Sequence, residues 1–280
     1  MIGFEIQGHR GINWGFGSRQ SSPLRLVTDP TGVMGAELKN EWISTVAQPG
    51  AYHNGTVHGQ VSWEVEVHTK DAKLTPGELV TLAVTWRRSL GRGELLTFLC
   101  ESEGGGVRTQ GVRLDENLPY LNLDLLQNAG YFRETVRFKS ESSWFKKRPL
   151  ERTFTTAQFA AATIPNPSDI DAAPIFEITG PLTSPVLGVG EAVTLTGAVI
   201  PAGQTWRIVT DKRRISIIDV ATGANKLRTT YEARGSQPFV WDKEVPAEPG
   251  EHPLTLGGTD GTTATRIKVI LEQNYTMGVG

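Results

Sequence analysis

Hydrophobic and polar residues alternate most regularly over residues 61–68, VSWEVEVH. Successive side chains of a β-strand point to opposite faces of the sheet. One face would carry the four apolar residues Val61, Trp63, Val65 and Val67. The other face would carry Ser62, Glu64, Glu66 and His68. The pattern therefore predicts a half-buried strand with a polar face in contact with water.

A single segment has the spacing of a helix, LTPGELVTLAVTWRRSLG. Its apolar residues recur at helical intervals and form one stripe, made of Leu79, Leu82, Ala83 and Trp86. Thr75 is a predicted N-cap, because Pro76 follows it and Glu78 completes a capping box. Gly91 would end the helix. We expect this helix to be embedded in a domain that is otherwise built of strands.

The second half of the chain reads as short strands separated by Gly and Pro turns, which predicts an antiparallel sandwich of jelly-roll type. Between the halves, AAATIPNPSDIDAAP has no strand periodicity and reads as a linker. We therefore predict a mostly β protein in two domains. The first spans residues 1–165 and holds the helix, residues 166–174 are the linker, and residues 175–280 form a jelly-roll or galectin-like β-sandwich.

Composition narrows the class of protein. The chain has 280 residues, of which 38% are hydrophobic and 21% charged, and this suits folded domains. A net charge of −2 provides no bulk attraction to nucleic acid, so we expect no specific nucleic-acid binding. The single cysteine, Cys100, lies in an apolar run and reads as a buried, inert thiol. The first residues lack the apolar core of a secretion signal, and no stretch suits a bilayer span, so we expect no membrane insertion.

The segment YHNGTVHGQVSWEVEVH concentrates the residue types that catalysis and metal binding use. Glu64 or Glu66 could form a zinc site with His68 and a histidine of the preceding loop, which holds His53 and His58. The spacing does not match an established zinc motif. A polar strand face explains the same residues without a ligand, so we expect no metal and no cofactor.

Motifs of enzymes are absent from the sequence: there is no Gly-x-Ser-x-Gly elbow, no phosphate-binding glycine loop and no His-Glu-x-x-His. Paired carboxylates such as Asp115 and Glu116 are adjacent in sequence and would point in opposite directions on a strand. We therefore expect no enzyme and no catalytic residue. A hydrolase remains the third class of hypothesis.

The order of several loose motifs resembles the distal tail proteins of siphophages, over nearly the whole chain. In the second half these are Ile178–Pro181, Pro185, the segment 202–213 and the turn 249–254. In the first half they are an early Trp/Gly loop, the helix, and the segment VRFKSESSWFKKRP. The resemblance implies a structural virion protein with a galectin-like sandwich outside a ring, commonly hexameric. Such a ring would join the tail tube to the tip or baseplate and to host-attachment proteins. The protein would be made in the host cytoplasm and located at the tail tip of the virion.

An assembly subunit needs surfaces that match a copy of itself. Trp14 lies among glycines without an apolar stripe and is our candidate for such an interface, together with the polar face of Glu64, Glu66 and His68. Because the first half precedes the linker, we assign the ring to it. We expect residues 1–165 alone to oligomerise and residues 171–280 to stay monomeric.

The alternative function is a carbohydrate-binding module for adhesion to the host, since jelly-roll sandwiches often bind sugars. Its candidate glycan contacts are Tyr231, Phe239 and Trp241. The same aromatic residues could instead pack the sandwich, and fold analogy alone does not give function.

Overall fold

The computed structural model describes residues 3–44, 51–69, 74–122, 126, 128, 130–228, 230 and 243–279, with the backbone alone for 42–44 and 51–55. The chain forms two compact units. Unit 1 consists of Met1–Lys147 together with Tyr275–Gly280, and unit 2 is Arg148–Asn274.

This division does not match the predicted boundaries at 165 and 175. The segment 166–174 lies inside unit 2, where Asn166 and Ala172 are buried. Ala172 exchanges two backbone hydrogen bonds with Val245, and the amide of Asn166 donates to the carbonyls of Ile170 and Val245. The prediction that the segment 160–174 lacks strands is wrong for Thr163–Pro165, which form a strand that pairs with Glu251–Pro253. Proline-rich composition did not imply exposure either, because a buried asparagine side chain satisfies the backbone groups that no strand satisfies.

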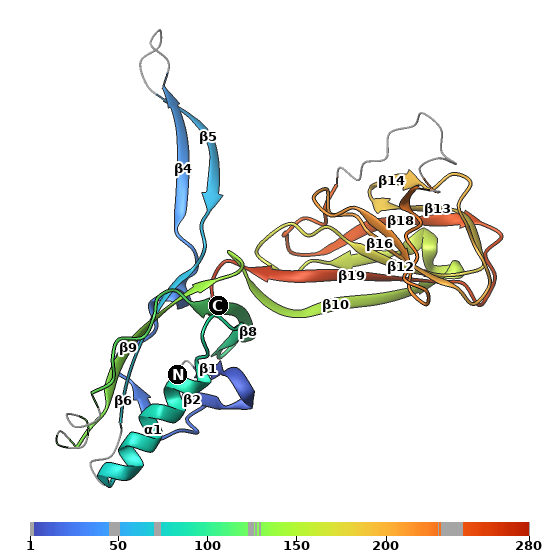
Figure 1. Ribbon diagram of the computed structural model, residues 1–280. Coiled ribbons are helices and arrows are strands. Elements are labelled where there is room, and N and C mark those ends of the chain that lie inside the picture. Colours follow the sequence, from blue (N-terminus) through green and yellow to red (C-terminus); the bar gives the residue numbers. More distant parts are fainter. Residues whose placement is uncertain are drawn as a thin grey trace. The chain divides into compact units, whose positions relative to one another are not determined.

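Unit 1 is built on one antiparallel sheet in the order β2-β1-β7-β8-β9-β6-β3. Its strands are β1 (Gly3–Gln7), β2 (Asn13–Gly17), β3 (Leu24–Leu26), β6 (Ser62–Thr69), β7 (Leu96–Ser102), β8 (Gly106–Leu114) and β9 (Arg133–Ser140). The short helices η1 (His9–Gly11) and η2 (Thr31–Met34) lie between strands in sequence, and the main helix is α1 (Pro76–Ser89). Figure 1 shows α1 beside the strands of this unit.

The predicted helix is confirmed with its capping box. The backbone N–H of Thr75 donates to the Glu78 carboxylate at 2.8 Å, and the N–H of Glu78 donates to Thr75 Oγ1 at 3.4 Å. The predicted stripe faces the core, since Leu79, Ala83 and Trp86 are buried and Leu82 packs at its margin. Local sequence therefore set both the start and the buried face of α1.

The alternation over 61–68 is also confirmed. All four apolar residues of that face are buried, and Trp63 packs at ring-centroid distances of 5.8 Å from Phe4, 5.0 Å from Phe98 and 5.7 Å from Phe145. Its indole Nε1 donates to Gln110 Oε1 at 2.7 Å, which satisfies a donor that burial would otherwise leave unpaired. The strand β6 therefore carries the centre of the core of unit 1.

The last residues of the chain belong to unit 1. Tyr275 is buried, with the guanidinium of Arg108 at 4.0 Å and the Lys147 ammonium at 4.7 Å from its ring centroid. Arg108 also donates to the carbonyl of Met277 at 2.7 Å, and the N–H of Gly278 donates to Val33 at 2.8 Å. Cation–π contacts and backbone hydrogen bonds thus hold the C-terminal segment in place.

Unit 2 is a sandwich of two antiparallel sheets around its own core. One sheet has the order β17-β16-β12-β19-β10, and the other has the order β11-β18-β13-β14 with β15 on β13. Its strands are β10 (Phe145–Thr155), β11 (Thr163–Pro165), β12 (Ile175–Thr179), β13 (Leu182–Val189), β14 (Glu191–Thr194), β15 (Val199–Ile200), β16 (Thr205–Val209), β17 (Ser216–Asp219), β18 (Glu251–Thr259) and β19 (Arg266–Tyr275). The short helix η3 (Thr156–Ala161) follows β10. The prediction of a mostly β protein with a C-terminal sandwich is confirmed.

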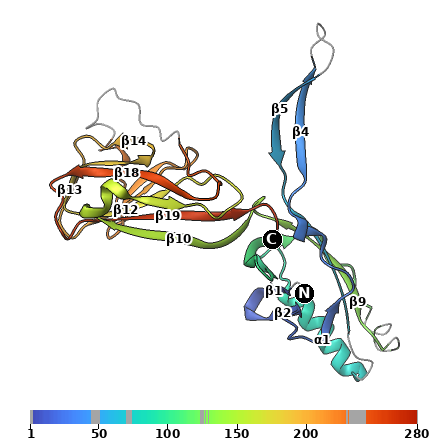
Figure 2. The ribbon, with the colours of Figure 1, turned by 180° about the vertical axis from the view of Figure 1, so that it is seen from behind.

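A separate hairpin completes unit 1. It consists of β4 (Leu38–Ser44) and β5 (Ala51–His58), which pair with each other in a two-stranded sheet of their own. In Figures 1 and 2 this pair stands apart from the sheet and helix of its unit. None of the helices in the described ranges is long and apolar enough to cross a membrane.

Candidate interaction surfaces

The polar face of β6 forms an ion-pair ladder with β9. Glu64 lies opposite Arg137 in register and accepts from its Nε at 3.0 Å, and Glu66 accepts from Arg133 Nε at 2.6 Å. These hydrogen bonds, with the charges of the carboxylates, raise the pKa of both arginines. Two of the predicted interface residues are therefore already engaged within their own sheet.

The ladder continues toward the end of β8. Arg137 reaches Glu116 at 3.5 Å, and Lys139 reaches Asp115 at 2.8 Å. Cross-strand pairs of opposite charge stabilise a sheet only modestly when they are exposed to water. The arrangement is a wet, charge-balanced sheet surface.

His68, the third predicted residue of this face, lies in register between Arg25 on β3 and Arg133 on β9. Two neighbouring guanidinium groups make this a poor place for a metal cation. Over the described residues no three His, Cys, Asp or Glu side chains come together as a metal would need. The ring of His58 instead packs on Trp144, with 4.3 Å between the ring centroids. The side chain of His53 lies outside the described residues.

Trp14 lies in the core of unit 1. Its ring is only 5% exposed and meets Trp86 edge-on at 5.4 Å, and its Nε1 donates to Ser89 Oγ at 2.7 Å. The sequence around Trp14 shows no apolar stripe because its apolar partners come from α1. Little of its surface is left for another subunit, and an interface role for Trp14 stays a prediction that no contact tests.

The candidate glycan contacts Tyr231, Phe239 and Trp241 lie outside the described residues. Cys100 is buried, and burial raises the pKa of its thiol to about 12, only partly opposed by the charge of Arg108. A thiol in that state is protonated at neutral pH and is a poor nucleophile, in agreement with the inert role predicted for it.

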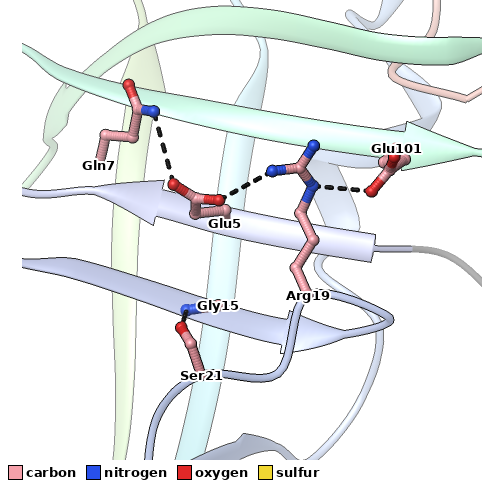
Figure 3. Close-up of polar contacts among 6 residues, drawn as sticks. All are labelled: Glu5, Gln7, Gly15, Arg19, Ser21 and Glu101. Carbon is pink, nitrogen blue, oxygen red and sulfur yellow. Dashed lines mark hydrogen bonds and ion pairs between the residues drawn. The ribbon is translucent and has the colours of Figure 1, made fainter.

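An arginine clamp that the sequence did not reveal lies on the outer face of β1 and β7 (Figure 3). Arg19 donates from Nη1 to Glu5 at 2.9 Å and from Nε to Glu101 at 2.8 Å. Burial alone would lower the pKa of Arg19, but the hydrogen bonds to Glu5 and Glu101 outweigh it and raise that pKa. The two carboxylates come from strands nearly a hundred residues apart in sequence, so no local spacing could signal the clamp.

Gly15 makes the close approach of this loop possible. A Cβ at Gly15 would lie 1.9 Å from the carbonyl oxygen of Arg19, so any other residue would push the loop away. The N–H of Gly15 donates to Ser21 Oγ at 3.2 Å, which holds the far side of the same loop (Figure 3). The glycine thus lets residues 18–21 fold back over the sheet and places Arg19 between its two carboxylates.

The hairpin of β4 and β5 exposes apolar side chains to solvent. The side chains of Leu38 and Val57 are 64% and 48% exposed, and the neighbouring residues Lys39 to Glu41 and Thr56 are exposed as well. An isolated two-stranded hairpin is marginally stable in water, because its faces bury little apolar surface. In the described residues β4 and β5 form a sheet of two strands, and the outer edge of such a sheet can pair with another chain or lie on another surface.

Comparison with known proteins gives a match in fold but not in sequence. No family model matches the chain, and no curated protein matches it in sequence. The crystal structure of SPP1 Dit (gp 19.1), described as a paradigm of the hub adsorption apparatus in phages infecting Gram-positive bacteria, superposes with a TM-score of 0.62 at 10% identity, over 97% of this chain and 98% of that one. The chain has the fold of SPP1 Dit. The predicted resemblance to phage tail proteins is therefore confirmed at the level of the fold.

Two structures of the phage P2 baseplate in its activated conformation are also similar. The one with Ca has 12% identity and a TM-score of 0.44, and the one with Sr has 13% identity and a TM-score of 0.46. Each match covers 98% of this chain and 98% of the other chain.

Proposed function

We propose that this protein is a structural hub component at the distal end of a phage tail. The observation that carries the proposal is the fold shared with SPP1 Dit over 97% of the chain, both units included. The protein would join the tail tube to the tip or baseplate and to host-attachment proteins, as part of the virion assembled in the host cytoplasm. It would act through interfaces and without catalysis or cofactor.

Within this proposal unit 1 forms a ring of six copies, the number that the resemblance to distal tail proteins implies. The exposed hairpin supports self-association, because its two strands gain stability when a second copy covers Leu38 and Val57. A repeated head-to-tail contact closes into a ring when its surfaces are held rigidly. The arginine clamp and the hydrogen-bonded core of unit 1 support the rigidity that this needs.

The solution mass of the purified full chain, with negative-stain images, tests the proposal. We expect a closed ring whose mass is a small multiple of 30.5 kDa. Replacing Leu38 and Val57 by serine should shift the population to monomer while the thermal midpoint of the monomer stays the same. A matched pair of changes at exposed apolar residues of unit 2, Val199→Ser and Val220→Ser, should leave the ring intact. A wild-type protein that stays monomeric at all concentrations would contradict the ring.

A further inference from the structure

A groove of about 1200 Å³ lies in unit 1 beside the C-terminal end of α1. Its walls come from η1, from the turn that follows α1, and from the end of β8 with the residues after it. The ion-pair ladder, the arginine clamp and the hairpin take no part in it, apart from two carboxylates at the end of the ladder. The groove therefore has no role in the function proposed above.

Three guanidinium groups in the groove lack an ionic partner. Arg10, Arg88 and Arg92 line it, and across the described residues none of the three forms an ion pair. Arg10 donates only to a ring nitrogen of its neighbour His9, at 3.3 Å. The fourth lining arginine, Arg87, is different, because it pairs with the buried Glu134 and donates to the carbonyl of Pro119.

The carboxylates of the groove are already engaged. Asp115 pairs with Lys139 at 2.8 Å and Glu116 with Arg137 at 3.5 Å. Glu94 accepts a hydrogen bond from the backbone N–H of Arg92, and that bond lowers the pKa of Glu94. Glu94 keeps its charge and interacts electrostatically with His9 and Arg10, so three arginines without an ion pair face one such carboxylate and the lining keeps a surplus of positive charge.

The backbone at Arg10 supports a role for its side chain. Arg10 has φ 62° and ψ 24°, in the left-handed region that glycine adopts freely and other residues adopt at a cost of about 1–3 kcal/mol. Its side chain is exposed and packs into no core, so packing does not explain the arginine. Strained backbone positions cluster at functional sites, so an arginine that lines a groove from such a conformation is a candidate binding residue.

The lining chemistry selects among anionic ligands. Val84, Leu114 and Leu118 give the same groove apolar patches. The carboxylates of Glu94, Asp115 and Glu116 interrupt the positive charge of the lining, which suits separate anionic groups better than a continuous phosphate backbone. Separate carboxylates on a peptide can each reach a guanidinium, in the two-bond geometry that arginine and carboxylate favour, while apolar side chains between them contact the patches. We propose that this groove binds an acidic, leucine-rich peptide segment of a partner protein, with Arg10, Arg88 and Arg92 holding its carboxylates.

The test uses the full chain and a fluorescent octapeptide of alternating glutamate and leucine, measured by anisotropy at low salt. We expect saturable binding that weakens by about tenfold for each of Arg88→Glu and Arg92→Glu, as loss of one charge-assisted contact predicts. The control variant is Arg213→Glu, which changes the charge equally at an exposed arginine of unit 2 and should bind as the wild type does. A peptide with glutamine in place of glutamate should not bind.

Three results would overturn the proposal. One is an absence of saturable binding of the glutamate peptide to the wild type. Another is an equal loss in Arg213→Glu, which would reduce the effect to net charge. The third is tighter binding of a single-stranded DNA oligonucleotide that the same groove variants abolish, which would assign the groove to nucleic acid. The thermal midpoint of each variant shows whether it is folded. If Arg88→Glu or Arg92→Glu does not fold, Arg88→Gln or Arg92→Gln is used in its place.

Discussion

Units 1 and 2 hold their buried tryptophans in different ways. In unit 1, Trp14, Trp63 and Trp86 each donate the indole N–H to a side chain, at 2.7, 2.7 and 2.9 Å. In unit 2, Nε1 of Trp206 is buried and has no hydrogen-bond partner among the described residues. Trp14, Trp63 and Trp86 of unit 1 are therefore fixed by directional bonds, whereas Trp206 of unit 2 is held without a bond to its indole N–H. Under the proposed function, a unit that presents fixed surfaces to copies of itself would gain from such directional bonds.

The two units also differ in continuity. Unit 2 is one uninterrupted segment of the chain. Charged residues on its sheet form a row of ion pairs with one another: Lys268 lies 2.9 Å from Glu151 and 3.6 Å from Glu177, and Glu177 lies 3.4 Å from Arg207. Unit 1 includes the C-terminal segment of the chain, a hairpin with exposed apolar side chains and a groove whose lining includes arginines that form no ion pair among the described residues. The two candidate binding surfaces, the hairpin and the groove, therefore both belong to unit 1.

The largest effect is expected from removing residues 275–280. The deletion removes a buried tyrosine and leaves the buried Arg108 without its carbonyl acceptors, a loss on the order of 5 kcal/mol, which is comparable to the whole stability of a small domain. Calorimetry should show the transition of unit 1 lost or strongly lowered while that of unit 2 persists. Met277→Ala keeps the backbone carbonyl that Arg108 uses, changes only a partly exposed side chain and is the matched control, expected near the wild type. If the truncated chain keeps both transitions, the last residues are not part of the core of unit 1.

Trp14→Ala comes next, because it separates a core role from an interface role. The ring is buried against Trp86, so we expect a loss of about 3–5 kcal/mol in the free energy of unfolding of unit 1. Denaturant unfolding at a concentration where the protein is monomeric gives this number. A variant with unchanged monomer stability but impaired assembly would instead support the interface role predicted from the sequence.

Trp63→Phe and Trp206→Phe compare the two cores directly. The first change leaves the buried oxygen of Gln110 without its donor and should cost about 1–3 kcal/mol. The second removes an indole N–H that has no acceptor among the described residues, so it should cost clearly less. Chemical denaturation with separate fluorescence probes for the two units measures both. Equal losses would show that the hydrogen bonds of unit 1 do not distinguish its core.

Sequence reasoning succeeded where the determining contacts are local. The capping box joins Thr75 to Glu78, three residues away, and it is confirmed. The alternation around Trp63 involves residues within one strand, and it is confirmed as well. It failed where contacts join distant segments. Trp14 finds its partners on α1, and Tyr275 finds Arg108 across more than 160 residues of sequence separation.

The candidate site followed the same rule. The strand that carries Glu64, Glu66 and His68 was correctly placed, but their arginine partners on β9 lie about seventy residues further along the chain. Only the antiparallel register of β6 and β9 brings them together, and no pattern within either strand encodes that register. The groove arginines likewise gather from η1 and from both sides of the end of α1.

The smallest effect concerns the pH dependence of a surface pair in unit 2. Arg152 donates to both oxygens of Glu251, at 2.7 and 2.8 Å, and this hydrogen bonding lowers the pKa of Glu251. Because the folded-state pKa lies below the unfolded one, the stabilisation is present above the unfolded pKa and is lost as the pH falls through the folded value. A carbon-detected NMR titration should place the Glu251 pKa below the usual glutamate range, and Arg152→Gln should return it toward that range. Arg214→Gln, which breaks a pair elsewhere in the same unit, should leave the Glu251 pKa unchanged. A Glu251 pKa that does not respond to Arg152→Gln would mean that the pair is not formed in solution, and that unit 2 forms fewer surface ion pairs than the contacts indicate.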